Sequence, residues 1–159
     1  MSQDEQLKKV NILLSCLDGS GSASEYEAIK NLRNMLGSEL PSILSREYEK
    51  SRKWQQRCSY VFFSIRSSRE NLDAVKLGIK ALNDRSKKVR YRACMLLAWS
   101  LSKDALGPLQ QAKVLFNDED TLDNICAAID AIENKNSNYF VDRSHSGKIR
   151  LKIVGDSQE

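Results

Sequence analysis

Residues 81–101 read ALNDRSKKVRYRACMLLAWSL, and this stretch decides the fold. Leu82 and Asp84 stand where a first helix is expected to end, and Ser86 is placed to cap a second helix through its side-chain oxygen. The stretch therefore predicts two helices joined by a short polar turn, with Arg90 and Arg92 off the buried face of the second. That face is made of apolar residues at helical spacing. They are Val89, Ala93, Leu96, Leu97 and Leu101.

The size and composition of the chain indicate a single helical domain. Its 159 residues suffice for one core, and 41% hydrophobic with 29% charged residues is the balance of a globular protein. Aromatic residues make up only 7% and prolines number two, which favours helices over a β-sandwich. The net charge of +4 is mildly basic and falls short of that of a dedicated DNA-coating protein.

The cysteines and the single histidine, His145, match no common metal-site pattern. The cysteines form no CxxC pair and lie in apolar helical segments, as small buried side chains do in a reducing compartment. They are Cys16, Cys58, Cys94 and Cys126. No cofactor or metal is expected. Residues 2–9 do not resemble a signal peptide, and no apolar run approaches the roughly 20 residues of a membrane span, so a cytoplasmic location is expected.

Further helices are expected on both sides of the opening stretch, from apolar periodicity and from capping residues. Ser2 and Ser24 are each followed three residues later by glutamate, which predicts capping boxes, and residues 67–68 are expected to cap another helix. The acidic residues 118–120 suit the start of the last long helix. The larger aromatic side chains are assigned to the core rather than to a binding surface. They are Trp54, Tyr60, Phe62, Phe63 and Trp99.

A repeat of about 33–35 residues is visible in the sequence. The apolar pattern of residues 54–62 matches that of 89–97, and residues 115–126 match 82–93. The order Leu-x-Asp, Val-Arg, Ala and Leu in the opening stretch resembles a HEAT repeat. The resemblance implies a mainly all-α fold over residues 1–136, in which antiparallel helical hairpins stack into a right-handed α-α superhelix. It also implies that Arg90 pairs with an acid of the adjacent repeat. Asp123 and Asp130 depart from the pattern and mark a weaker or terminal unit.

The last part of the chain changes period. In residues 148–154 charged and aliphatic side chains alternate, which is typical of a half-buried strand. Residues 139–142 are short and β-rich, and residues 143–147 have the composition of a turn. The pattern predicts a C-terminal β-hairpin within residues 137–159, packed on the same domain through Ile149, Leu151 and Ile153.

Basic residues gather at the start of the helix that follows Ser86 and at the equivalent place one repeat earlier. Positive charge in the first turn opposes the helix dipole, which points to another role for it. We call these residues the basic strip and expect it to bind an acidic partner. Its members are Arg52, Lys53, Arg57, Lys87, Lys88, Arg90 and Arg92, with Tyr91 as an aromatic contact and Arg143 and His145 as a second contact. The alternative is that Arg90 pairs internally and the lysines are simply solvated.

No arrangement of nucleophile and base suggests catalysis. Asp142, Arg143 and His145 crowd into one expected turn, which explains their polarity. We therefore expect a non-enzymatic protein-binding module. Small HEAT-like proteins with a short β tail resemble immunity proteins, which neutralise a toxin by stoichiometric binding, and a toxin with an acidic face would fit this basic chain. The alternatives are a HEAT-like protein that binds nucleic acid in a basic groove, as one family of DNA glycosylases does, and an enzyme-like relative of the bilin lyases.

Overall fold

The computed structural model of the chain describes residues 2–153, and all the regular structure within them is helical. The chain is thus an all-α domain of packed helices, as expected. Short 3-10 turns at Gly37–Glu39 (η1), Lys103–Ala105 (η2) and Ser137–Phe140 (η3) accompany the longer elements. The α-helices are α1 (Gln3–Ser15), α2 (Ala23–Leu36), α3 (Leu40–Lys50), α4 (Trp54–Ser64), α5 (Leu72–Ala81), α6 (Lys87–Ser100), α7 (Leu106–Leu115) and α8 (Glu119–Glu133).

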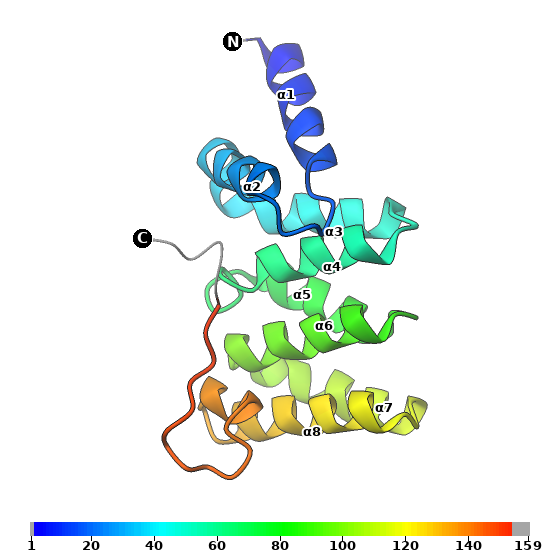
Figure 1. Cartoon of the computed structure of the whole chain (residues 1–159), viewed down its shortest axis with the longest axis vertical. Coiled ribbons are helices and arrows are strands. Elements are labelled where there is room, and N and C mark those ends of the chain that lie inside the picture. Colours follow the sequence, from blue (N-terminus) through cyan, green and yellow to red (C-terminus); the bar gives the residue numbers. More distant parts are fainter. Residues whose placement is uncertain (1, 154–159) are drawn as a thin grey trace.

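The helices stack in two layers. Figure 1 shows α4, α6 and α8 as successive rows of one layer, with α5 behind them. Helix α6 is central, because it packs against α4, α5 and α8. Consecutive helices also pair, α3 with α4, α5 with α6 and α7 with α8, while α1 stands at one end of the stack against α2. The layer of α4, α6 and α8 therefore presents one continuous outer face.

The apolar face predicted for α6 forms the centre of the core. Val89, Ala93 and Leu97 are fully buried, with an exposed fraction of 0%. Gly78 on α5 allows a close approach here, because a Cβ at this position would meet the Leu96 side chain. Leu101 ends the helix in a left-handed conformation, with φ of 56°. The prediction of a helix that is buried along this face is confirmed.

Three predicted helix caps differ from the structure. Ser86 stands at the N-cap of α6 as predicted, but its side chain makes no capping hydrogen bond. The other two caps are shifted along the chain. Helix α2 is capped by Ser22, whose hydroxyl accepts the N–H of Glu25, and not by Ser24. Helix α5 is capped by Asn71 rather than by residues 67–68, and its side-chain oxygen accepts N–H groups of the first turn. The cap prediction for α1 is confirmed, since the Ser2 hydroxyl accepts the N–H of the residue three positions on.

The predicted C-terminal β-hairpin is wrong within the described residues, because residues 141–153 contain no strand. Side-chain oxygens, and not the carbonyls of a neighbouring strand, accept the hydrogen bonds of backbone N–H groups in this segment. The Asp142 carboxylate accepts the N–H groups of Ser146 and Gly147, at 3.0 and 2.8 Å. The N–H of Leu151 donates to the Asn138 side chain at 2.9 Å. A strand needs a neighbouring strand for these same groups, and none lies beside it among residues 2–153.

The segment nevertheless packs on the helices. Leu151 and Ile153 are each 7% exposed, as the alternating pattern predicted, whereas Ile149 is 49% exposed. Phe140 is fully buried beside Tyr91 of α6, with 5.8 Å between the ring centroids. The last residue of the predicted strand, Val154, and the residues after it lie outside the described part of the chain. Figure 1 shows the segment running along the edge of the stack from α8 towards the loop that joins α4 to α5.

Candidate functional site

The outer face of α4 and α6 carries aromatic and cationic side chains side by side. On α4, Trp54 is 37% exposed and so does not lie in the core as predicted, whereas Phe62 is partly buried and packs against the core. On α6, Lys88 and Tyr91 are exposed and Arg92 is partly buried. We call these five residues the cation–aromatic face.

The cations of this face lie over its aromatic rings. The Lys88 ammonium is 4.9 Å from the centroid of the Trp54 ring. The Arg92 guanidinium is 4.7 Å from the Phe62 centroid and 5.5 Å from that of Tyr91. Such contacts hold the long side chains in place at a stabilisation of roughly 0.5–1 kcal/mol each. Among residues 2–153 neither cation has a carboxylate within ion-pairing distance.

Arg57 of the basic strip is buried and engaged inside the fold. Its guanidinium donates to both oxygens of Asp84, at 2.8 and 3.1 Å, and to the Ser51 carbonyl. The Tyr48 hydroxyl donates to the same carboxylate at 2.6 Å. Burial alone would raise the pKa of Asp84, but hydrogen bonds from Arg57, Tyr48 and the backbone N–H of Ser86 hold this pKa below its ordinary value. Arg57 therefore joins α4 to the turn before α6 and does not face solvent.

Arg90 occupies the equivalent position on α6 and is also buried. It donates to the Asp84 carbonyl at 2.7 Å and to the Thr121 hydroxyl at 3.1 Å, and its Nη2 lies 3.5 Å from Asp118 Oδ1. Its guanidinium also lies 4.4 Å from the centroid of the Phe116 ring. Of the two alternatives set out for Arg90, the structure shows internal pairing with the next helical pair.

The remaining cations of the basic strip lie at the edge of the layer where α4 and α6 begin. Arg52, Lys53 and Lys87 are exposed. Lys87 approaches Asp120 at 3.9 Å, a contact between two exposed side chains that contributes little. The positively charged edge ends at α8, whose N-cap Asp118 is followed by two further acids. The prediction of a surface strip is therefore wrong for Arg57 and Arg90, which are buried, while the other members reach the surface at least in part.

Arg143 and His145 pack against α8, and Arg143 also lies 5.7 Å from the centroid of Phe140, the ring that contacts Tyr91. Arg143 pairs with Asp123 at 2.7 Å, and His145 Nε2 lies 2.6 Å from Asp130 Oδ2. The His145 ring stacks on Tyr139 with 3.6 Å between centroids. These contacts fasten residues 141–147 to α8. They account for the two acids that depart from the repeat pattern.

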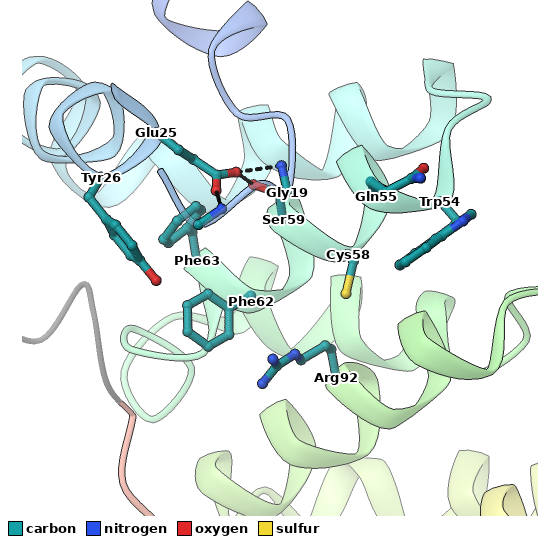
Figure 2. Close-up of a pocket in the computed structure, with 11 residues that line it drawn as sticks. Gly19, Glu25, Tyr26, Trp54, Gln55, Cys58, Ser59, Phe62, Phe63 and Arg92 are labelled. Atoms are coloured by element: carbon teal, nitrogen blue, oxygen red, sulfur yellow. Dashed lines mark hydrogen bonds between the residues drawn. The ribbon is translucent and has the colours of Figure 1, made fainter. Parts of the chain in front are cut away.

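A hollow of about 150 Å³ opens between the 18–22 loop, α4 and α6. Figure 2 shows Trp54 and Tyr26 on its two sides, with Phe62 and Arg92 between α4 and α6. Cys58 contributes a thiol whose pKa is raised by burial, so that it is neutral at physiological pH. The hollow therefore combines aromatic walls with one cation.

The buried Glu25 fixes the loop that forms the upper wall of the hollow. Its carboxylate accepts N–H groups of Gly19 and Gly21, at 2.7 and 2.8 Å, and the Ser59 hydroxyl at 2.7 Å (Figure 2). Gly19 itself touches α4, because a Cβ there would collide with the Gln55 carbonyl. Sequence reasoning missed this cluster, although the pair of glycines before a glutamate was a signal for such a loop.

Three further features bear on chemistry in the described residues. The four cysteines are free. Cys94 is buried as predicted, but Cys16 and Cys58 are only partly buried and Cys126 is exposed. Within residues 2–153 no three His, Cys, Asp or Glu side chains are grouped so as to hold a metal ion. None of the described helices combines the length and apolarity that crossing a bilayer requires.

Comparison with protein-family models and with curated proteins finds no match to this chain.

Proposed function

We propose that the chain is a non-enzymatic, HEAT-like protein-binding module that acts in the cytoplasm and engages an acidic partner through its cation–aromatic face. The observation that carries the proposal is the state of Lys88 and Arg92. Both cations are held over aromatic rings and have no carboxylate partner among the described residues. Arginine and the larger aromatic side chains are the residues that dominate the energetics of protein interfaces.

The spacing of the internal ion pairs supports the HEAT-like part of the proposal. Arg57 and Arg90 stand at the same place on α4 and α6, and each reaches an aspartate in the turn before the next helix of its layer. The same link therefore joins two successive helical pairs, as in a solenoid in which each repeat contacts its neighbours. A right-handed superhelix is the arrangement that we propose for such pairs.

Neutralisation of a toxin is the role that we propose for the module. An immunity protein needs rigid helices that present an open face to one partner in a 1:1 complex. The toxin role rests on family-level analogy, and the cations of the face support an acidic partner. That partner presents an acidic surface, which complements the two free cations and increases the association rate.

The test is affinity capture with the immobilised full chain from nuclease-treated lysate of its source cells. We expect a single protein partner that forms a 1:1 complex in size-exclusion chromatography with light scattering. Charge reversal of Lys88 and Arg92 together to glutamate is expected to abolish capture. The matched control is the double variant Lys76→Glu, Lys113→Glu, which makes the same change in net charge at exposed residues of α5 and α7. Recovery of nucleic acid without protein from an untreated lysate would contradict the proposal.

Nucleic-acid binding is the second candidate, favoured by the exposed Arg52, Lys53 and Lys87 beside Trp54. Phosphate contacts would give an affinity that falls steeply with salt, with a slope of roughly −0.7 per contact for single strands. Exposed tryptophan would supply base stacking. Fluorescence anisotropy with a labelled oligonucleotide tests it, and a Lys87→Glu, Lys88→Glu double variant that binds as the wild type does would exclude it.

A further inference from the structure

The hollow beside Arg92 is too small for most cofactors and large enough for a side chain. Its volume is about 150 Å³, whereas pockets for drug-sized ligands occupy about 300–1,000 Å³. It is partly open to solvent, so that a residue from another chain has access to it. Its natural occupant is therefore one or two side chains of a protein partner.

The guanidinium of Arg92 is held in place, and among residues 2–153 its hydrogen bonds go to sulfur atoms, those of Met95 and Cys58. Because Phe62 and Tyr91 lie against the guanidinium, the aromatic contacts fix the side chain but accept no strong hydrogen bond. The hydrogen bond found for its Nη1 goes to the Met95 sulfur at 3.7 Å, and a thioether is a weak acceptor. The planar guanidinium of an arginine can donate two parallel hydrogen bonds to the two oxygens of a carboxylate. A guanidinium that its neighbours already hold in position loses little conformational entropy when it binds.

The other polar groups of the hollow do not neutralise this charge. Glu25 is directed to the two loop N–H groups and to Ser59, as described above. Cys58 is a neutral thiol. The hollow thus holds one carboxylate, that of Glu25, which is turned to the loop, and one guanidinium, that of Arg92. No ion pair between the two is found among residues 2–153, so Arg92 can bind one carboxylate of a partner. A phosphate dianion would need a second cation inside the hollow, and Lys88 lies outside its lining, over Trp54.

We infer that this hollow binds an aspartate or glutamate side chain of the partner, with the carboxylate on the Arg92 fork and an adjacent apolar side chain against Trp54 and Phe62. The inference rests on the proposed function and specifies its recognition element. The partner segment is accordingly an acidic residue next to an aliphatic or aromatic one, rather than a run of acids. Arg92 supplies charge and geometry, and the aromatic walls exclude water from the contact.

A direct test uses small probes on the full chain and needs no identified partner. We would follow the side-chain N–H signals of Arg92 and Trp54 by nitrogen-15 NMR during titration with 3-phenylpropionate, its neutral amide and phenyl phosphate. We expect saturable shifts with the carboxylate and binding at least about tenfold weaker for the amide, because the amide lacks the charge. Equal binding of the amide, or tenfold tighter binding of the phosphate, would overturn the inference.

Variants place the binding at Arg92. Arg92→Gln is expected to abolish carboxylate binding, and Arg92→Lys to retain it only weakly, since lysine keeps the charge but not the fork. Lys76→Gln on α5 is the matched control and should bind as the wild type does. If 3-phenylpropionate binds Arg92→Gln unchanged, the inference is wrong.

The two proposals fail separately. If lysate capture yields a 1:1 partner but the probe does not shift Arg92, the hollow is not the recognition element and the protein-binding function stands. If the probe binds at Arg92 but no protein is captured, the carboxylate site stands and the binding function does not.

Discussion

The Arg57 guanidinium on α4 and the Asp84 carboxylate before α6 form a buried bidentate ion pair, with N–O distances of 2.8 and 3.1 Å. The Tyr48 hydroxyl of α3 completes the site at 2.6 Å. One carboxylate thus joins α3 and α4 to the turn that precedes α6. Charges buried in this way add stability only if every partner is present, because an unpaired buried charge is costly.

Removal of one partner should therefore be strongly destabilising. We expect Arg57→Met to lower the free energy of unfolding by about 3–5 kcal/mol, since Asp84 loses its counter-charge while remaining buried. Urea denaturation followed by circular dichroism measures the change. Arg52→Met is the control, because Arg52 is exposed in the segment before α4 and should change stability by no more than about 0.5 kcal/mol. Equal effects of the two variants would show that the pair contributes nothing.

The same pair gives a pH dependence of stability with a defined sign. The pKa of Asp84 is lowered in the folded state from its ordinary 3.8, so the unfolded chain binds a proton first as pH falls. Its contribution is complete above that ordinary value and is lost below it, as pH falls through the folded pKa. We expect the stability difference between wild type and Asp84→Asn to be constant above about pH 5 and to shrink towards pH 2. A difference that grows on acidification would contradict this assignment.

The sequence predicted the helical fold well because its strongest signal is local. The α6 face with Val89 and Leu97 repeats at 3.6-residue spacing, and burial follows from that spacing alone. The pairing of Arg90 with the next repeat was also foreseen as one alternative. The N-terminal caps of α2 and α5 lie a few residues away from the predicted serines, because several polar residues near each helix start can act as the cap. Tertiary contacts decide which of them does so.

The wrong predictions for Trp54 and Arg57 share one cause. The offset used to align the two repeats was two residues too long. Matching Trp54 to Val89 sets an offset of 35, whereas the ion pairs relate Arg57 to Arg90 at an offset of 33. Two residues rotate a helical position by about 200°. The longer register therefore placed Trp54 in the core and Arg57 on the surface, and the structure reverses both. The hairpin failed for another reason, since no periodicity reveals that Asp142 binds backbone N–H groups of its own loop.

The loop at the hollow should depend on Gly19 more than on Gly21. Both have positive φ, at 77° and 70°, which costs a side-chain-bearing residue about 1 kcal/mol. Only at Gly19 would a Cβ also collide with the backbone carbonyl of Gln55, while the space around Gly21 is open. We expect Gly19→Ala to lower the free energy of unfolding by about 2–4 kcal/mol and Gly21→Ala by about 1 kcal/mol. Equal losses in thermal and urea unfolding would contradict the close approach of the loop to α4.

The C-terminal segment should open when the Asp142 carboxylate is removed. This carboxylate accepts two backbone N–H groups and the Ser146 hydroxyl, at 2.8–3.0 Å. In Asp142→Ala these groups lose their acceptor, so we expect faster tryptic cleavage after Lys148 and Arg150. Asp123→Asn, which weakens only the exposed pair with Arg143, is the control and should be cleaved nearly as slowly as the wild type. Equal cleavage rates in Asp142→Ala and wild type would show that other contacts hold the segment.

Charge reversal at Lys88 should separate binding from stability. In Lys88→Glu, loss of the contact with Trp54 costs about 0.5–1 kcal/mol, but an acid in the first turn of α6 gains about 0.3–1 kcal/mol from the helix dipole. The two effects oppose each other, so we expect the free energy of unfolding to change by less than about 0.5 kcal/mol in urea titrations. Association with the captured acidic partner, measured by stopped flow, should be about tenfold slower than that of the wild type at low salt. The difference between the two rates should shrink as ionic strength rises.

The control for this measurement is Lys76→Glu, which makes the same change in net charge on the opposite layer of the fold. If the cation–aromatic face steers the partner, Lys76→Glu slows association far less than Lys88→Glu, because attraction between exposed charges decays over about 10 Å at 0.1 M salt. If the two variants slow association equally, net charge and not this face governs the encounter. The proposed binding surface would then have to be sought elsewhere on the stack.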